Sequence, residues 1–198
     1  MIQTKHSVQN GFALLITLLT VGVIISATLA IVELSRLQLQ LSVDSRDAEA
    51  AFSAANAAKE CAQYVRTTSA VGIRNNDSSI GTNCLGTNFS MTRLSHGFGV
   101  SGGGNGAVRR YRSLINWDAS GSARCSVIEM IVVYAETGNI TIGTGSNNLQ
   151  RIISNYHNPT MTCVRGSECT IIAASGYNST CSGRNAVGVL KREVLLEF

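Results

Sequence analysis

The sequence has little charge, little proline and few aromatic side chains. Charged residues make up 14% of the 198 residues, aromatic residues make up 6%, and Pro159 is the single proline. Disordered acidic chains and proline-rich linkers contain far more charge or proline, so this chain is expected to fold. A formal net charge of +4 is too small to make nucleic acid the expected partner. The length suits one ordinary domain with an appendage and excludes two full enzyme domains.

Motifs for catalysis, metal binding and phosphate binding are absent or incomplete. No C-x-x-C pair occurs, no His lies at metal-ligand spacing, and no H-E-x-x-H is found. Residues 97–102 match G-x-G-x-x-G by letter, but Gly and Asn follow where a phosphate-binding helix would begin. We therefore predict no catalytic residue, no metal and no cofactor, and a protein that is not an enzyme. A secreted enzyme held by a signal anchor is the least favoured alternative.

Cysteine is the exception to this sparse composition. Because the cysteines lack metal-binding spacing, disulfide bonds in an oxidising compartment explain them better than zinc. The sequence does not choose among the many pairings that six cysteines allow. A Cys61–Cys84 bond would tie a polar segment to the preceding helix, and a Cys163–Cys169 bond would close a small loop. The six candidates are Cys61, Cys84, Cys125, Cys163, Cys169 and Cys181.

A long uncharged run lies near the N-terminus. Residues 11–32 contain no charged side chain, and as a helix they would reach about 33 Å, which is roughly the thickness of one hydrocarbon core. Lys5 precedes the run, and Glu33 and Arg36 follow it. This charge distribution favours an N-terminus in the cytoplasm and a chain that lies outside from about residue 33 onward.

The apolar pattern continues beyond this run at helical spacing. An ordinary cleaved signal would have a shorter apolar region and a better cleavage site than the one that ends at Ala30. Pro is absent from Phe12 to Thr67, and Gly22 is the single Gly there, so we predict one helix of roughly 50 residues. The apolar residues expected on one face of its later part are Leu34, Leu37, Leu41, Ala48, Phe52, Ala55, Ala58, Ala62 and Val65.

The N-terminal sequence resembles a known family of signals. A short polar leader with a basic residue ends in Gly11, and Phe12-Ala13-Leu14-Leu15 and the long apolar helix follow. This arrangement resembles the class III signal of type IV prepilins and type II secretion pseudopilins. The resemblance implies that a prepilin peptidase cuts between Gly11 and Phe12 and methylates the new amino group of Phe12. The segment 51–62 is also similar to the A-F-x-A-A-x-x-G-x-E pattern of minor pilins, with Ala58 in place of the Gly.

One position departs from the major pilins of that family. They have Glu as the fifth residue of the mature chain, and here that residue is Ile16. In an apolar filament core the carboxylate neutralises the amino terminus of a neighbouring subunit, and an unpaired buried charge is costly. A subunit without the acid is poorly suited to repeat along a filament and better suited to its tip. We therefore interpret the chain as a minor pilin. The alternative is that Ile16 is one more lipid-facing residue of a signal anchor.

The rest of the chain indicates loops and then strands. Gly, Ser, Asn and Thr predominate from Ser69 to about Gly106, which predicts loops. The nearly all-apolar stretch 126–135 predicts a central strand covered by the outer half of the helix, with a hairpin turn at 134–139. The last strand is expected at or near a sheet edge. The predicted strands of this antiparallel sheet are 107–115, 126–135, 139–142, 170–174 and 187–198.

Together these patterns predict an α+β, type IV pilin-like fold. Its long N-terminal helix, with a transmembrane inner half, is expected to pack on an antiparallel β-sheet. The expected segments are a leader at 1–11, a membrane or filament-core helix at 12–35, the outer half of the helix at 36–68 and an extracytoplasmic head at 69–198. The resemblance implies a structural minor pilin of a type IV pilus or type II secretion-like pseudopilus. Its partners would be the cytoplasmic membrane, the prepilin peptidase, other pilin subunits and the assembly machinery.

A second hypothesis is a membrane-anchored extracytoplasmic binding module for adhesion or DNA capture. Arg109, Arg110 and Arg112 form a basic cluster with Tyr111 among them, which could attract an anionic ligand. On a strand, Arg110 and Arg112 share one face and Arg109 points to the other. A solvated strand face explains the cluster more simply, so nucleic acid stays an alternative partner without further support.

Overall fold

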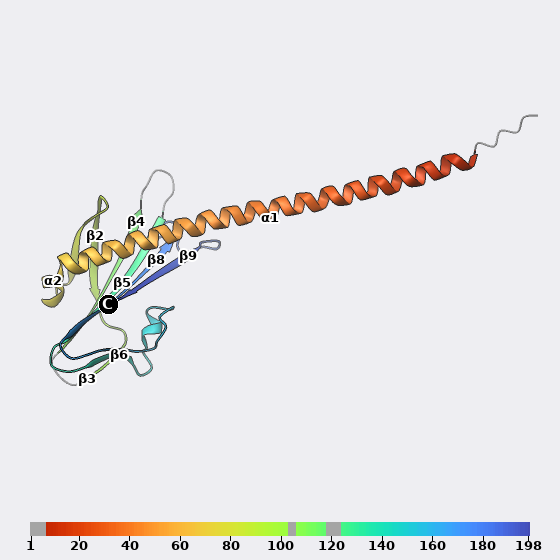
Figure 1. The fold of residues 1–198 in the computed structure, drawn as a ribbon. Coiled ribbons are helices and arrows are strands. Elements are labelled where there is room, and N and C mark those ends of the chain that lie inside the picture. The colour runs from red at the N-terminus through yellow and green to blue at the C-terminus, as the bar shows by residue number, and fades with distance from the viewer. Residues whose placement is uncertain (1–6, 103–105, 118–123) are drawn as a thin grey trace, which may run out of the picture. The chain divides into compact units, whose positions relative to one another are not determined.

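The computed structural model describes residues 7–102, 106–117 and 124–198, with side chains of the helix from Phe12 onward. The chain divides into two compact units, Met1–Arg46 and Asp47–Phe198. The first unit contains the inner part of helix α1 (Ser7–Thr68), and the second contains its outer part and the β-sheets (Figure 1). Lys5 of the predicted leader lies outside the described residues.

Helix α1 confirms the prediction of one long helix. It runs for 62 residues and is followed by the short helix α2 (Ala70–Arg74). The helix begins at Ser7, before the predicted cleavage site, because no proline interrupts the residues on either side of Gly11. The apolar pattern therefore predicted the type of this element and its C-terminal end, whereas the helix is longer at its N-terminal end than the roughly 50 residues expected.

The main sheet has six strands and confirms the predicted α+β class. Every neighbouring pair is antiparallel, and the order is β1-β2-β4-β5-β8-β9. The predicted apolar strand is β5 in the interior of this sheet, and the predicted C-terminal strand is β9 at its edge. The strands are β1 (Ser79–Cys84), β2 (Thr87–Leu94), β4 (Ala107–Trp117), β5 (Arg124–Ala135), β8 (Ser167–Tyr177) and β9 (Lys191–Glu197).

Two predictions about the strands are wrong. The region 69–106 contains α2, β1, β2 and β3 (Gly99–Gly102), although its polar composition predicted loops. In β2 the buried residues Phe89 and Met91 alternate with exposed polar residues. Two apolar side chains are too short a pattern to predict a strand from the sequence. The predicted hairpin at 134–139 does not form, because β6 (Ile140–Thr144) pairs with β3 and β7 (Met161–Cys163) in a separate three-stranded sheet.

The strand β5 is buried on both of its faces. One face contributes Ile128, Met130 and Val132 to a core shared with the outer part of α1. The other face contributes Ile131 and Val133 to a second core, shared with β6, β7 and the 3₁₀ turn Leu149–Arg151. In a sheet with one solvent-exposed face, every second residue of a strand is polar. Strand β5 lacks this alternation because both of its faces are covered.

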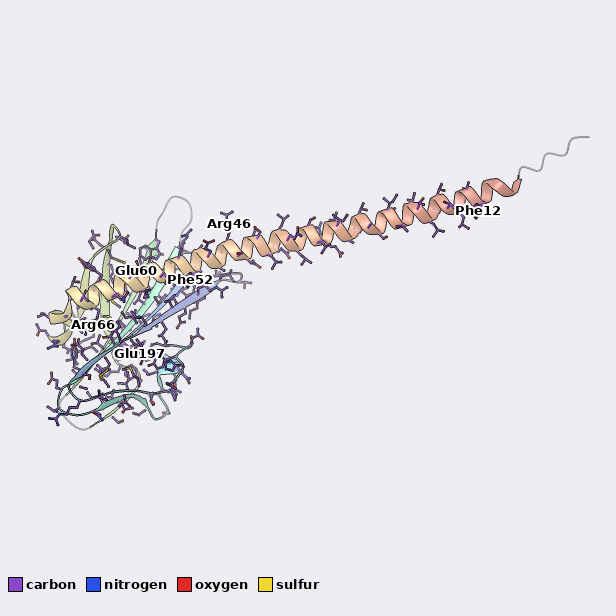
Figure 2. The ribbon with its side chains drawn as sticks, viewed as in Figure 1. Phe12, Arg46, Phe52, Glu60, Arg66 and Glu197 are labelled. Atoms are coloured by element: carbon purple, nitrogen blue, oxygen red, sulfur yellow. A yellow bond between two sulfur atoms is a disulfide. The ribbon has the colours of Figure 1, made fainter. Side chains whose placement is uncertain are left out.

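The outer part of α1 contacts the sheet through small side chains. The buried positions recur at helical spacing, so they lie on one face of the helix. Because most of them are alanines, the helix backbone approaches the strands closely. Phe52, expected on this face, is instead 51% exposed, so that part of the prediction is wrong (Figure 2). Ser126 Oγ of β5 donates to the Ala54 carbonyl at 2.8 Å, which fixes the helix in register with the strand. The buried helix residues are Ala51, Ala54, Ala55, Ala58, Cys61, Ala62 and Val65.

We expect Gly176→Ala to loosen this contact strongly. A Cβ at Gly176 of β8 would overlap the Ala51 carbonyl and crowd the Ala55 amide, both of which are backbone groups of the helix. The free energy of unfolding should fall by about 3 kcal/mol, since overpacking here moves a helix rather than a side chain. Thermal denaturation followed by circular dichroism measures the change. Ser175→Ala, on the opposite face of the same strand, is the control and should cost less than about 1 kcal/mol.

Candidate functional site

The inner part of α1 is apolar and exposed on all sides. Gly11 lies within the helix, and every described side chain from Phe12 to Arg46 is exposed. This helix is long enough and apolar enough to cross a membrane. The four hydroxyl groups between Phe12 and Val32 are satisfied within the helix, which suits a medium without water. Thr17, Thr20, Ser26 and Thr28 each donate to a carbonyl three residues earlier in the helix.

The predicted processing and assembly residues lie at the start of this apolar surface. Phe12 is 69% exposed (Figure 2), and Ile16 is 44% exposed one helical turn further on. A residue of the helix four positions after another lies on the same side, so Phe12 and Ile16 share a face. No acidic side chain occurs from Phe12 to Val32, so this face has no carboxylate that could neutralise an amino terminus.

The apolar surface continues past the first charged residues. Glu33 and Arg36 interrupt it, but large apolar side chains follow for almost three further helical turns. They are between 55% and 68% exposed, and two of them point to the side opposite to the other three. These residues are Leu34, Leu37, Leu39, Leu41 and Val43.

All six cysteines form disulfides. Cys61–Cys84 and Cys163–Cys169 are the two bonds that the sequence suggested, and Cys125–Cys181 is the third. The first bond joins the buried face of α1 to the end of β1. The described residues contain no free cysteine and no cluster of His, Cys, Asp and Glu that would hold a metal.

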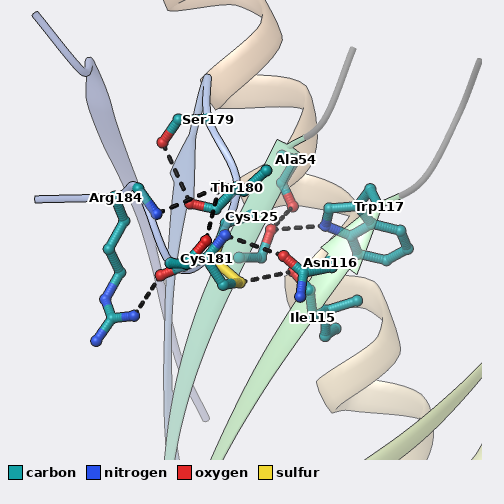
Figure 3. The surroundings of a disulfide bond; sticks show 12 residues. Ala54, Ile115, Asn116, Trp117, Cys125, Ser179, Thr180, Cys181 and Arg184 are labelled. Carbon is teal, nitrogen blue, oxygen red and sulfur yellow. Dashed lines mark hydrogen bonds between the residues drawn. A yellow bond between two sulfur atoms is a disulfide. The ribbon is translucent and has the colours of Figure 1, made fainter. Parts of the chain in front are cut away.

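The Cys125–Cys181 bond is surrounded by polar contacts (Figure 3). The amide of Cys181 donates to Asn116 Oδ1 at 2.9 Å, and the indole of Trp117 donates to Ser126 Oγ at 2.8 Å. Because Ser126 also contacts the carbonyl of Ala54, the bond adjoins the junction of helix and sheet. The disulfide therefore joins the segment after β8 to the start of β5, the strand whose Ser126 is hydrogen-bonded to the helix.

The three predicted arginines do not form a single patch. Arg110 and Arg112 share one face of β4, as predicted, and both contact the carboxylate of Glu129, at 3.0 and 3.2 Å. Arg109 lies on the other face, beside Tyr111. Its chain is held by a hydrogen bond from Nη1 to the Val108 carbonyl at 3.3 Å. The charges of Arg110 and Arg112 are thus partly neutralised by Glu129 within the fold.

A buried ion pair that the sequence did not reveal joins α1 to β8. Arg66 near the end of α1 forms a salt bridge with Glu168 and donates from Nε to Thr170 Oγ1 at 3.0 Å. Arg74 contacts the second oxygen of Glu168 at 3.0 Å. Burial lowers the pKa of the Arg66 guanidinium, but an arginine stays charged in proteins. Since its partner is about 100 residues away in the sequence, no local pattern could identify this pair.

No protein-family model, curated protein or solved structure matches the chain. The architecture itself is pilin-like, with one long apolar N-terminal helix whose outer part packs on an antiparallel sheet.

Proposed function

We propose that this protein is a structural minor pilin. The apolar helix anchors the precursor in the cytoplasmic membrane, with the N-terminus inside and the head outside. After cleavage at Gly11–Phe12 the chain is incorporated into a type IV pilus or a type II secretion-like pseudopilus, or primes or caps that filament. The leader-like sequence, the helix and the disulfide-bonded head all support this proposal.

The length of the exposed apolar helix carries the proposal. From Phe12 to Val43 the helix has 32 residues and a length of about 48 Å, whereas a hydrocarbon core is about 30 Å thick. Tilting could not hide the excess, because the required tilt of about 50° exceeds the range seen for membrane helices. A single subunit in a bilayer would therefore leave about ten residues of the helix outside the hydrocarbon core, where exposed Leu and Val side chains alternate with polar ones.

Neighbouring helices would cover this excess. Leu34, Leu37 and Leu41 lie on one side of α1, and Leu39 and Val43 lie on the opposite side. Covering both sides takes at least two partner helices, which is the environment of a helical filament core. The move from lipid to that core exchanges one apolar surrounding for another, so it does not require unfolding.

The absence of an acid at Ile16 supports a position at the filament tip. A subunit at the tip has no neighbour above it whose amino terminus needs a carboxylate. A subunit in the shaft would leave such an amine unpaired in apolar surroundings, at a cost of several kcal/mol. The second candidate function is ligand capture by the head, and it is favoured by the arginines of β2 and β4 that have no carboxylate partner among the described residues.

The first test is intact-mass and N-terminal peptide mass spectrometry on protein purified from its native membrane. We expect a mature chain that starts at Phe12 and carries one methyl group on its amino nitrogen. A chain that begins at Met1 would mean a permanent signal anchor, and a cut near Ala30 would mean an ordinary secretory signal. Either of these results would contradict the proposal.

A further inference from the structure

A basic cavity opens where β2 leaves β4. The two strands pair only from Thr92 to Leu94, opposite Arg112 to Arg110. Beyond Leu94 this pairing ends, and a cavity of about 390 Å³ lies beside β4. The described residues that line it include three arginines and no carboxylate. The polar side chains among them that matter here are Asn76, Arg93, His96, Arg109 and Arg110.

Two of these arginines lie on one face of the sheet. Arg93 is the direct cross-strand partner of Tyr111, and Arg109 precedes Tyr111 by two residues, so Arg93 and Arg109 are diagonal neighbours. Burial raises the pKa of Tyr111, while the positive charges of Arg109 and Arg93 counteract this shift. The Tyr111 hydroxyl donates to the backbone carbonyl of Asp77 at 3.1 Å, and as a neutral group it does not offset the charge of either guanidinium.

Backbone carbonyls hold the side chains in place without cancelling their charge. Arg93 Nη1 donates to the Asn76 carbonyl at 2.9 Å. The carbonyl of Val108 accepts from Arg109 Nη1 at 3.3 Å and from the His96 ring at 2.6 Å, which requires the tautomer with hydrogen on Nε2. Both arginines are thus fixed beside the cavity, with donors to spare.

The cavity has an excess of positive charge. Among the described residues, neither Arg93 nor Arg109 has a carboxylate within 4.0 Å, and Arg109 Nε is buried without a hydrogen-bond partner. Arg110 directs Nε to Glu129, but that single carboxylate also serves Arg112. Its Nη1 makes only long contacts, at 3.3 and 3.4 Å, to the carbonyls of His96 and Ser95. A buried donor without a partner is costly, so an acceptor with negative charge would stabilise this arrangement.

We propose that this cavity binds an oxyanion of the phosphate class, held by Arg93 and Arg109 with Arg110 beside them. Guanidinium groups match phosphate oxygens with paired, charge-assisted hydrogen bonds. The volume lies at the lower end for small-molecule sites, which suits a phosphate group alone or one carried by a small organic molecule or a DNA strand. The proposal does not depend on the filament role, because the site lies within the head.

Binding can be measured on the full chain in a non-ionic, phosphate-free detergent. Inorganic phosphate and a short single-stranded DNA are titrated separately, and calorimetry gives each Kd. The Nε–H signals of Arg93 and Arg109 in nitrogen-15 NMR spectra report on the site itself. We expect saturable phosphate binding that shifts these two signals. Arg109→Gln should weaken it by about tenfold or more, as for the loss of one charge-assisted contact.

Two further variants separate the site from general surface charge. Arg93→Gln removes the second arginine and tests the site again if Arg109→Gln lowers the melting temperature. Arg192→Gln is the matched control, since Arg192 is exposed on β9 and its side chain makes no hydrogen bond or ion pair within the described part of the chain. It should change Kd by less than about twofold.

The comparison of titrants identifies the source of the phosphate. Tighter binding of DNA than of phosphate, lost in both cavity variants, would assign the site to a nucleic acid backbone. Equal or weaker binding of DNA would assign it to a small phosphorylated molecule. Absence of saturable binding of both titrants would overturn the proposal, and so would equal weakening by Arg192→Gln.

Discussion

Replacing Gly11 with leucine is expected to abolish maturation. The precursor should accumulate at its full mass, with no methylated Phe12 and no subunit in sheared filaments. Gly11 lies within the described helix, where glycine costs about 1 kcal/mol relative to alanine. Glycine therefore weakens the helix beside the bond that a peptidase must reach. Leucine adds bulk next to that bond and strengthens the helix across it.

Gly22→Leu is the matched control for this experiment. It introduces the same side chain into the same helix, at a position where an added Cβ meets nothing within 4 Å. Processing at Gly11–Phe12 should continue at the wild-type rate, as judged by immunoblot and by mass spectrometry of the mature N-terminus. Normal cleavage of the Gly11→Leu chain would rule out a prepilin-type maturation step.

Reduction of the three disulfides is expected to unfold the head. Each disulfide stabilises the fold by restricting the unfolded chain, and the effect grows with the length of the loop that it closes. The expected contributions to the free energy of unfolding are about 4 kcal/mol for Cys125–Cys181, about 3 for Cys61–Cys84 and about 2 for Cys163–Cys169. Their sum is comparable with the whole stability of a typical domain. Fluorescence of Trp117, whose indole contacts Ser126 beside Cys125, should report unfolding of the full chain in detergent when reductant is added.

Paired serine variants test the order of these contributions. Cys125→Ser with Cys181→Ser should lower the melting temperature most, and Cys163→Ser with Cys169→Ser should lower it least. Each pair is compared with wild type under oxidising conditions, so that the remaining bonds stay intact. A reduced wild type that melts at the oxidised temperature would contradict the prediction, as would the reverse order of the pairs.

Local patterns were sufficient for the elements whose structure depends on near neighbours in the chain. The period of apolar residues and the absence of proline predicted α1, because an α-helix forms its hydrogen bonds four residues apart. The apolar run of β5 predicted an interior strand for a similar reason. The placement of Arg110 and Arg112 on one face of β4 and of Arg109 on the other followed from the alternation of side chains along a strand.

Contacts between distant segments decided the rest. The strands from Ser79 to Gly102 carry too few apolar residues to be recognised alone, and they form because β4 and β6 pair with them. The helix face that contacts the sheet excludes Phe52, because Gly176 and the alanines of α1 allow a closer approach.

The sequence by itself determined a long apolar helix, a leader-like N-terminus, a strand-rich head and paired cysteines. Only the tertiary structure decided that a second sheet covers β5, that Glu168 neutralises Arg66, and that Arg93 joins Arg109 beside a cavity. The physical reason is the range of the interactions. Helical periodicity and side-chain alternation act over a few residues, whereas burial, ion pairing and cavity formation depend on which distant segments the fold brings together.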